Sequence, residues 1–223
     1  MTATLPSELR DVFERSSTAE LITIDDSGRP HARSVRPAYR QGGVCIDIAP
    51  GQSVPDPRVA LLFAESELVV LVQGTAQAER VLHVRPERVY AWSPDDPDGE
   101  PRLFDAHLEE VRSGHNEEPE IGHAGPEGGH SVWETSLDDV DAGLLACVGP
   151  DGFPFAVRLA VSADAGERVL RLPEVPVGLP IEPGPACLHA GDARVEGDLV
   201  PRPDGWGLVP RRLLGGSRGA ATG

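Results

Sequence analysis

The sequence predicts an all-β protein made of two diverged copies of one small antiparallel unit, joined in a single chain. Three observations support this prediction: an internal repeat, turn signals between short apolar runs, and apolar residues that alternate with the two-residue period of strands. The chain has 223 residues. That length accommodates two units of about 100 residues each, a common domain size.

The internal repeat consists of four pairs of segments that occur in the same order at an offset near 124 residues. The matched pairs are Gly28 with Gly152, Ala60 with Ala186, Gly74 with Gly197, and Pro86 with Pro210. Ordered matches at a nearly constant offset are difficult to obtain by chance, so we expect both halves to adopt one topology.

Each copy reads as short strands separated by turns. Asp26–Pro30 and Pro150–Pro154 place a glycine between apolar runs, which predicts hairpins because glycine accepts positive φ. Val44, Ile46 and Ile48 alternate with Cys45 and Asp47, as in a half-buried strand. Val157, Leu159 and Val161 alternate in the same way, and the continuous apolar run 69–72 predicts a strand buried on both faces.

We expect a first unit over residues 1–92, an acidic Pro/Gly-rich linker over 93–136, and a second, degenerate unit with a frayed tail over 137–223. Helical signals occur at Ser7–Ser16 and, inside the linker, at Leu103–Arg112. The linker contains four histidines, namely His107, His115, His123 and His130. Their spacing of seven or eight residues does not match known zinc motifs, so no metal site is predicted.

Charge and composition exclude several functions. The formal net charge is −16, which opposes nucleic-acid binding. The chain has no lysine, which excludes a Schiff-base enzyme and a P-loop. No apolar run approaches the ~20 residues of a membrane span, and the N-terminus lacks the features of a secretory signal, so we expect a cytoplasmic protein without a membrane partner. Cys45, Cys147 and Cys187 are expected to be reduced thiols.

The chain resembles the pyridoxamine 5'-phosphate oxidase-like split-barrel family. The resemblance rests on the ordered segments Asp26–Pro30, Pro57–Leu62 and Val72–Ala76; it covers residues 5–92 well and 137–214 more loosely. It implies two six-stranded antiparallel Greek-key barrels in tandem. Members of this family usually bind FMN, or a deazaflavin or haem in some branches, between the two barrels of a homodimer. A tandem chain can form that pair intramolecularly, or two chains can form it as a homodimer.

The resemblance also implies a cofactor site. In the family, an Arg-x-Val motif on the second strand supplies an arginine to the flavin phosphate, and Arg33 and Val35 match that motif. A guanidinium stays charged and offers paired donors to a phosphate. With the neighbouring Ser34 and Arg36 and with Ser53 on a later loop, these residues form the predicted FMN site. The oxidase's lysine and its Arg-Lys pair are missing here, and the B6 substrate residues are not recognisable.

Two classes of function remain open from the sequence. The first is an FMN-dependent oxidoreductase acting on an unidentified small molecule, in which the flavin carries out the chemistry and no catalytic side chain is identified. The second is a degenerate, non-catalytic barrel pair that binds another ligand, such as haem, a deazaflavin or a metabolite, or no cofactor. The distinguishing feature is whether Arg33, Arg36 and Ser53 converge on one groove.

Overall fold

The computed structural model describes residues 7–40, 43–48, 54–65, 68–78, 81–96, 99–105, 141–164, 166–173, 175–176, 178–191 and 193–215. Within these ranges the regular elements are strands, apart from one helix, α1 (Ser7–Arg15). The predicted all-β class is therefore confirmed. In the part of the chain that the structure describes, no helix has the length and hydropathy needed to cross a bilayer.

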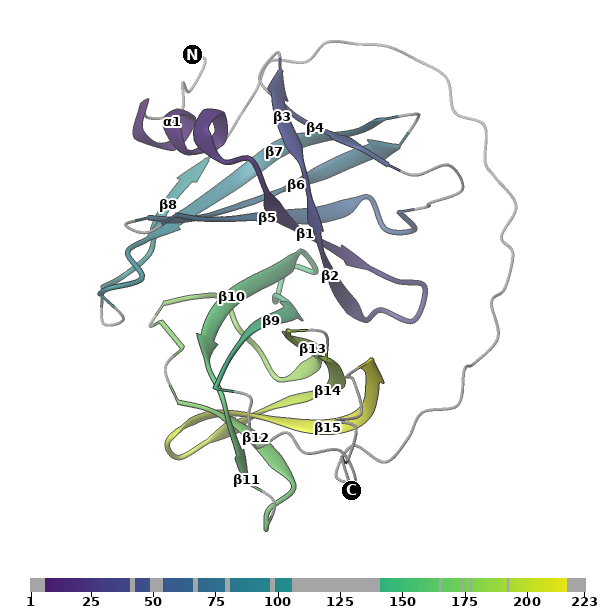
Figure 1. Ribbon diagram of the computed structural model, residues 1–223, viewed down its shortest axis with the longest axis vertical. Helices are drawn as coiled ribbons and strands as arrows, with labels where there is room; N and C mark the ends of the chain where they lie inside the picture. Colours follow the sequence, from purple (N-terminus) through teal and green to yellow (C-terminus); the bar gives the residue numbers. More distant parts are fainter. Residues whose placement is uncertain are drawn as a thin grey trace, which may run out of the picture.

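The first sheet is antiparallel and follows α1 in the chain; Figure 1 shows it in purple to teal. Its strands are β1 (Ala19–Ile24), β2 (Pro30–Val35), β3 (Pro37–Arg40), β4 (Gly43–Asp47), β5 (Arg58–Ala64), β6 (Val69–Ala78), β7 (Val81–Trp92) and β8 (Arg102–Asp105). The main path has the order β2-β1-β5-β6-β7-β4-β3, and β8 pairs with β7 outside this path.

The second sheet, green to yellow in Figure 1, has the equivalent order β10-β9-β13-β14-β15-β12-β11. Its strands are β9 (Ala142–Val148), β10 (Pro154–Ala160), β11 (Ser162–Asp164), β12 (Val169–Leu172), β13 (Gly184–Ala190), β14 (Ala193–Arg202) and β15 (Gly205–Gly215). The segments that matched in sequence lie on corresponding strands of the two sheets.

Each sheet curls until its two outer strands meet. β2 and β3 are at opposite ends of the first path, yet only Arg36 separates them in the chain. Because consecutive Cα atoms are about 3.8 Å apart, the end of β2 and the start of β3 must be neighbours in space. β10 and β11 are joined in the same way through Val161. With β2–β3 and β10–β11 each counted as one bent strand, each barrel has the six strands that the resemblance implied, and β8 is additional.

The burial of the strands follows the predicted patterns. Val44 and Ile46 are buried while Cys45 between them is half-buried, and all four residues of 69–72 are buried. The predicted N-terminal helix is α1, whose Leu9, Val12 and Phe13 lie on one face and pack into the core of the first barrel. The second predicted helix is wrong at its start, because 102–105 form β8, which pairs with β7; the rest of that segment lies outside the described residues.

The strand register corrects one of the four repeat pairs. Val59 is opposite Gly74 in the first sheet, and Ala186 is opposite Gly197 in the second. Ala186 is therefore equivalent to Val59, and Ala60 corresponds to the next residue of β13. The prediction was wrong by one residue because it matched two alanines without knowledge of the pairing. A slip of one residue turns every side chain of a strand to the opposite face.

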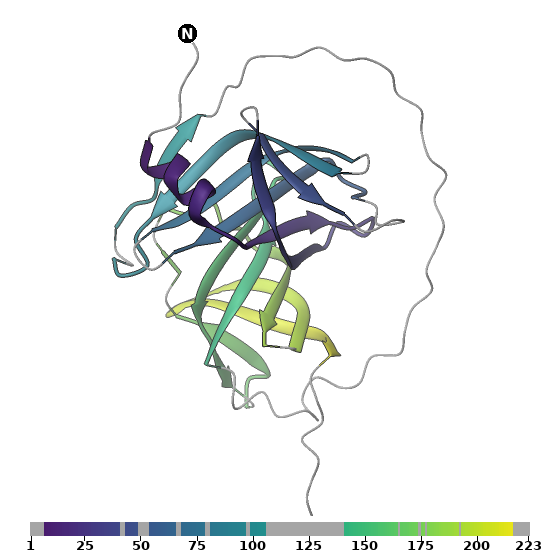
Figure 2. The same ribbon diagram turned by 45° about the horizontal axis from the view of Figure 1, so that its top comes forward.

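One apolar core is shared by the two sheets. It includes Ile22, Leu62 and Leu71 of the first sheet together with Phe155 and Leu188 of the second. β10 packs on β1, β5 and β6, and β2 packs on β9 and β13. Because β10 and β13 correspond to β2 and β5, an approximate two-fold axis relates these contacts. Figure 2 shows the two barrels stacked on each other along this contact.

A β-bulge recurs at the same place in both sheets. The register shifts between Gln73 and Gly74 in β6, and again between Glu196 and Gly197 in β14. A Cβ atom on Gly74 would lie 2.1 Å from the backbone oxygen of Arg85. The bulge therefore requires glycine because the neighbouring backbone comes too close for a side chain.

We expect Gly74→Ala to lower the free energy of unfolding by more than about 2 kcal/mol, because the clash is with backbone that must move. Gly28→Ala, at a turn with φ +77° and open space around the added Cβ, should cost only about 1 kcal/mol of conformational strain. Urea unfolding of both variants measures the difference. Equal costs would contradict a steric requirement at the bulge.

Candidate functional site

The approximate two-fold axis gives the contact between the barrels two equivalent halves with different chemistry. In one half, β10 of the second barrel faces β5 and β6 of the first; in the other half, β2 of the first barrel faces β13 and β14 of the second. The hairpin registers make Phe155 the equivalent of His31, and the bulges make Leu71 the equivalent of Arg194. We call these the apolar half and the polar half.

The apolar half is filled by aromatic side chains. Phe155 is fully buried, with its ring centroid 5.7 Å from Tyr90 in an edge-on arrangement and 6.4 Å from Trp92 in a stacked one. The buried Gln73 crosses the same contact and donates from Nε2 to the carbonyl oxygen of Pro154 at 3.0 Å. The rings thus pack directly on one another across the contact. The apolar half therefore acts as a packed core.

The polar half joins side chains from both barrels. Arg194 on β14 donates from Nη2 to Nδ1 of His31 on β2 and, at 2.6 Å, to Oε1 of Glu196. The other ring nitrogen of His31 lies 2.6 Å from Oδ2 of Asp25. A second contact crosses between the barrels from the backbone N–H of Ala32 to Nε2 of His189 at 3.3 Å. Hydrogen bonds thus connect β2 to β13 and β14.

The hydrogen bonds define the proton positions on both histidines. An arginine only donates, and Nη2 of Arg194 lies closer to Nδ1 of His31 than to Nε2, which is 3.2 Å away; we therefore assign Nδ1 as the acceptor and place the ring proton on Nε2, directed at Asp25. Nε2 of His189 accepts from Ala32, so the neutral ring of His189 carries its proton on Nδ1. Both contacts between the barrels consequently require unprotonated nitrogens.

Asp25 anchors this cluster through the β1–β2 turn. Burial acts to raise its pKa, but hydrogen bonds from Ser27, from the backbone N–H of Arg29 and from His31 outweigh burial and lower the pKa of Asp25 to about 2. Its Oδ1 accepts from the backbone N–H groups of Ser27 and Arg29, both at 2.9 Å. One carboxylate therefore both shapes the turn and orients His31.

His189 and Cys187 are held in their neutral forms. Burial, followed by the charge of Arg194 and by the charge that His31 carries when it is protonated, lowers the pKa of His189 to about 4. The thiol of Cys187 lies 3.3 Å from Nε2 of His189, and burial raises the pKa of this thiol to about 11. Burial also raises the pKa of Cys147 to about 12. Neither thiol has the lowered pKa of a nucleophile, and all three cysteines are free, as predicted.

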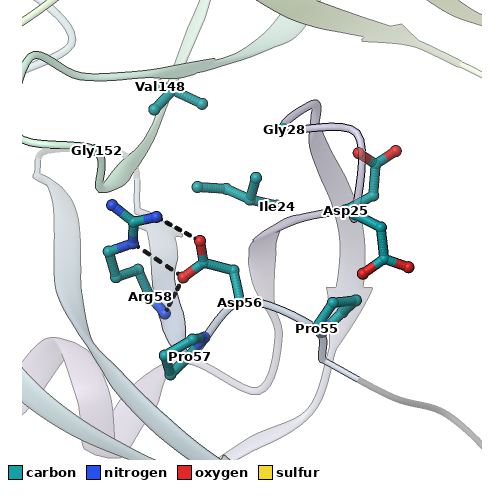
Figure 3. A pocket seen from close by; sticks show the side chains of 10 residues that line it. Ile24, Asp25, Gly28, Pro55, Asp56, Pro57, Arg58, Val148 and Gly152 are labelled. Atoms are coloured by element: carbon teal, nitrogen blue, oxygen red, sulfur yellow. Dashed lines mark hydrogen bonds and ion pairs between the residues drawn. The ribbon is translucent and has the colours of Figure 1, made fainter. Parts of the chain in front are cut away.

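A cavity of about 410 Å³ lies next to the polar half, between the β1–β2 turn, the segment before β5 and the β9–β10 turn (Figure 3). Its lining residues are Ile24, Asp25, Asp26, Gly28, Pro55, Asp56, Pro57, Arg58, Val148 and Gly152. The two barrels therefore both contribute to its wall.

The cavity is acidic. The guanidinium of Arg58 contacts Asp56 through Nε at 2.9 Å and Nη2 at 2.5 Å, which leaves the other carboxylates of the wall in excess. A Cβ atom on Gly152 would lie 2.1 Å from Nη1 of Arg58, so the glycine lets Arg58 approach the second barrel. The wall favours a cationic group and disfavours a phosphate.

The described residues of the predicted cofactor site differ in their exposure. Arg33 is half-buried on β2 opposite Leu21, Ser34 is exposed, and Val35 packs against the core of the first barrel. Arg36 is exposed between β2 and β3. Ser53 lies outside the described residues, so its convergence with the two arginines stays a prediction. None of the four predicted residues that the structure describes lines the cavity.

Arg33 differs from most arginines of the chain in its environment. Its Nε is buried without a hydrogen-bond partner, and burial lowers the pKa of Arg33. In the part of the chain that the structure describes, no carboxylate pairs with it. It follows His31 by two residues on the same face of β2, beside the polar half.

The polar cluster was not predicted from the sequence. His31 and Arg194 are 163 residues apart, and no motif connects them. The only available signal was a comparison of the two repeat copies. It would have shown that Phe155 and Leu71 in one copy correspond to the polar His31 and Arg194 in the other. That comparison requires the correct register of each strand pair.

We expect Asp25→Asn to lower the free energy of unfolding at pH 7 by about 1 kcal/mol, less than the full pKa shift implies because the side chain is 35% exposed. A carboxyl with a lowered pKa stabilises the fold above its unfolded pKa of about 3.9. This contribution is lost as the pH falls toward 2, so wild type and variant should converge there in urea unfolding. Asp26→Asn, at an exposed neighbour, is the control and should change little.

We expect Phe155→Ala to lower the free energy of unfolding by about 3–4 kcal/mol, because it empties a buried aromatic site between the barrels. His31→Ala, at the equivalent position, should cost less than about 1.5 kcal/mol because it removes only partly exposed hydrogen bonds. Chemical denaturation measures both. If His31→Ala lowered the free energy of unfolding more than Phe155→Ala does, the assignment of the apolar half as the main stabilising contact would be contradicted.

Comparison with known proteins finds similarity in structure only. The sequence matches no protein-family model and no curated protein. A protein of the pyridoxinephosphate oxidase family from Clostridium acetobutylicum, related to general stress protein 26, is 11% identical; the match covers 44% of this chain and 92% of that one, with a TM-score of 0.38. An FAD binding protein from Mycobacterium smegmatis is 14% identical, with 41% and 97% covered and a TM-score of 0.34.

Each match covers nearly the whole length of the neighbour but less than half of this chain. Similarity at this level carries no argument about ligands, and the architecture is established by the strand order of the chain itself. In fold, the protein is a tandem pair of split barrels and resembles the pyridoxamine 5'-phosphate oxidase-like proteins.

Proposed function

We propose that the protein binds FMN at one site per chain, with Arg33 contacting the phosphate and the two barrels of one chain forming the pair that encloses the cofactor. The observation that carries this proposal is the half-buried, unpaired cation at Arg33. The sequence resemblance assigns the phosphate-binding arginine of the family to this residue.

The environment of Arg33 supports an anionic ligand. Removing a guanidinium from water without a counter-ion costs free energy, and a phosphate recovers that cost through charge-assisted hydrogen bonds. The chain has 36 acidic residues, yet the described ion pairs leave Arg33 without one of them. A ligand phosphate is the partner that fits this position.

Two features of the chain restrict where the cofactor binds. The carboxylates of the cavity repel a phosphate, so the phosphate end lies at Arg33 and outside the cavity. The rings of Phe155 and Trp92 fill the apolar half, which supports one site rather than two symmetric ones. A bound flavin would supply electron or hydride transfer. The chain's own residues would bind the phosphate and exclude water. The proposal includes an oxidoreductase activity on a small-molecule substrate.

A second candidate function is a barrel pair that has lost its cofactor or binds a different ligand. The exposure of Arg36 favours it, because this residue adds no buried charge beside Arg33. The two candidates differ in one property: only the flavin proposal expects Arg33 to make the protein bind a flavin with a phosphate more tightly than one without.

Fluorescence titration with FMN and with riboflavin, which lacks the phosphate, tests the proposal. We expect wild type to bind FMN more tightly than riboflavin at a stoichiometry of one per chain. Arg33→Ala should weaken FMN binding by about 10- to 100-fold, as expected for a hydrogen bond to a charged group, and should leave riboflavin binding nearly unchanged.

Arg168→Asn is the matched control, because Arg168 is an exposed arginine with positive φ, which asparagine tolerates. This variant should bind FMN as wild type does. If neither flavin binds, or if Arg33→Ala binds FMN unchanged, the flavin proposal is wrong. A haem absorption band after addition of haem would then support the second candidate.

A further inference from the structure

The two halves of the contact between the barrels respond differently to protons. In the apolar half, the groups that cross the contact are aromatic rings, the amide of Gln73 and two arginine–carboxylate ion pairs, Arg158 with Glu20 and Arg88 with Asp151, and none of these contacts ends on a histidine. In the polar half, the described hydrogen bonds between the barrels end on ring nitrogens of His31 and His189, and the acceptor from Ala32 is the unprotonated Nε2 of His189. The same contact between barrels thus has a proton-sensitive half and an insensitive half.

The charges around His189 oppose its protonation. Arg194 and Glu196 reach it from β14, Cys187 from β13 and His31 from β2. The positive Arg194 and the neighbouring His31 disfavour a second positive charge, and Glu196 offsets them only in part because its carboxylate already accepts from Arg194 at 2.6 Å. Further from His189, Asp25 accepts a hydrogen bond from His31, and the positive charge of Arg29 acts to lower the pKa of Cys187.

Protonation also breaks the contact geometrically. A proton on Nε2 of His189 would point at the backbone N–H of Ala32, which replaces a hydrogen bond with two opposed donors. Protonation of His189 therefore removes the hydrogen bond that connects Ala32 on β2 to the second barrel.

We propose that His189 forms a proton-operated latch that holds β2 of the first barrel against β13 of the second, with the apolar half acting as the hinge. Acidification opens the polar half while Phe155, Tyr90 and Trp92 stay packed. The latch does not depend on the proposed cofactor, although Arg33 lies on β2 beside it.

The pH range follows from linkage. The pKa of His189 is lowered to about 4 in the folded chain and is about 6.5 when the ring is free. A histidine with a lowered pKa stabilises the closed form above its free pKa, and that contribution is lost as the pH falls from 6.5 toward 4. Between pH 7 and pH 5 we expect the ratio of open to closed forms to rise on the order of 10-fold.

Nuclear magnetic resonance of the full chain tests the latch without any substitution. The reporters are the backbone amide of Ala32 in the polar half and the side-chain amide of Gln73 in the apolar half. After correction for the intrinsic effect of pH on exchange, the hydrogen-exchange protection of Ala32 should fall on the order of 10-fold from pH 7 to pH 5. The signals of Gln73 should not change.

Two histidine variants make the test specific. His189→Gln keeps an acceptor but cannot titrate, so the protection of Ala32 should become independent of pH. His83→Gln alters an exposed histidine on β7 and should behave as wild type. The proposal is overturned if Gln73 opens in parallel with Ala32, if the protection of Ala32 does not depend on pH, or if it still falls with pH in His189→Gln.

Discussion

The burial of β10 against the first barrel is the interaction on which the rest of the structure depends. Phe155 is fully buried among Tyr90, Trp92 and the aliphatic side chains of β1, β5 and β6. Neither barrel covers this surface alone, so the two sheets share one core. The position of every group at the contact between the barrels, including the polar cluster and the cavity, follows from this packing.

The contact between the barrels illustrates how a two-fold pair becomes asymmetric once both halves are encoded by one chain. In a homodimer the two halves of a contact must carry the same residues. A single chain removes that restriction, so one half has Phe155 and Leu71 where the other has His31 and Arg194. One half supplies apolar packing, and the other carries polar and charged groups that are mostly half-buried.

Charge is placed unevenly around that asymmetry. Carboxylates gather at the cavity, where Asp25 belongs both to the wall and to the hydrogen bonds of the polar half. A few residues away on β2, Arg33 is half-buried without a carboxylate partner among the described residues. A protein with a net charge of −16 thus offers one desolvated position for an anion close to an acidic cavity.

The β class, the hairpin glycines and the tandem arrangement of two units could be predicted from the amino-acid sequence, because strand periodicity and turn chemistry are local properties. The sequence also singled out Arg33, through a motif within one strand. The tertiary structure decided the register that equates Ala186 with Val59, the strand β8 at 102–105, and the cluster of His31 with Arg194 and His189. These features depend on which strands pair and on how two sheets pack, and contacts between residues so distant in the chain leave no local pattern in the sequence.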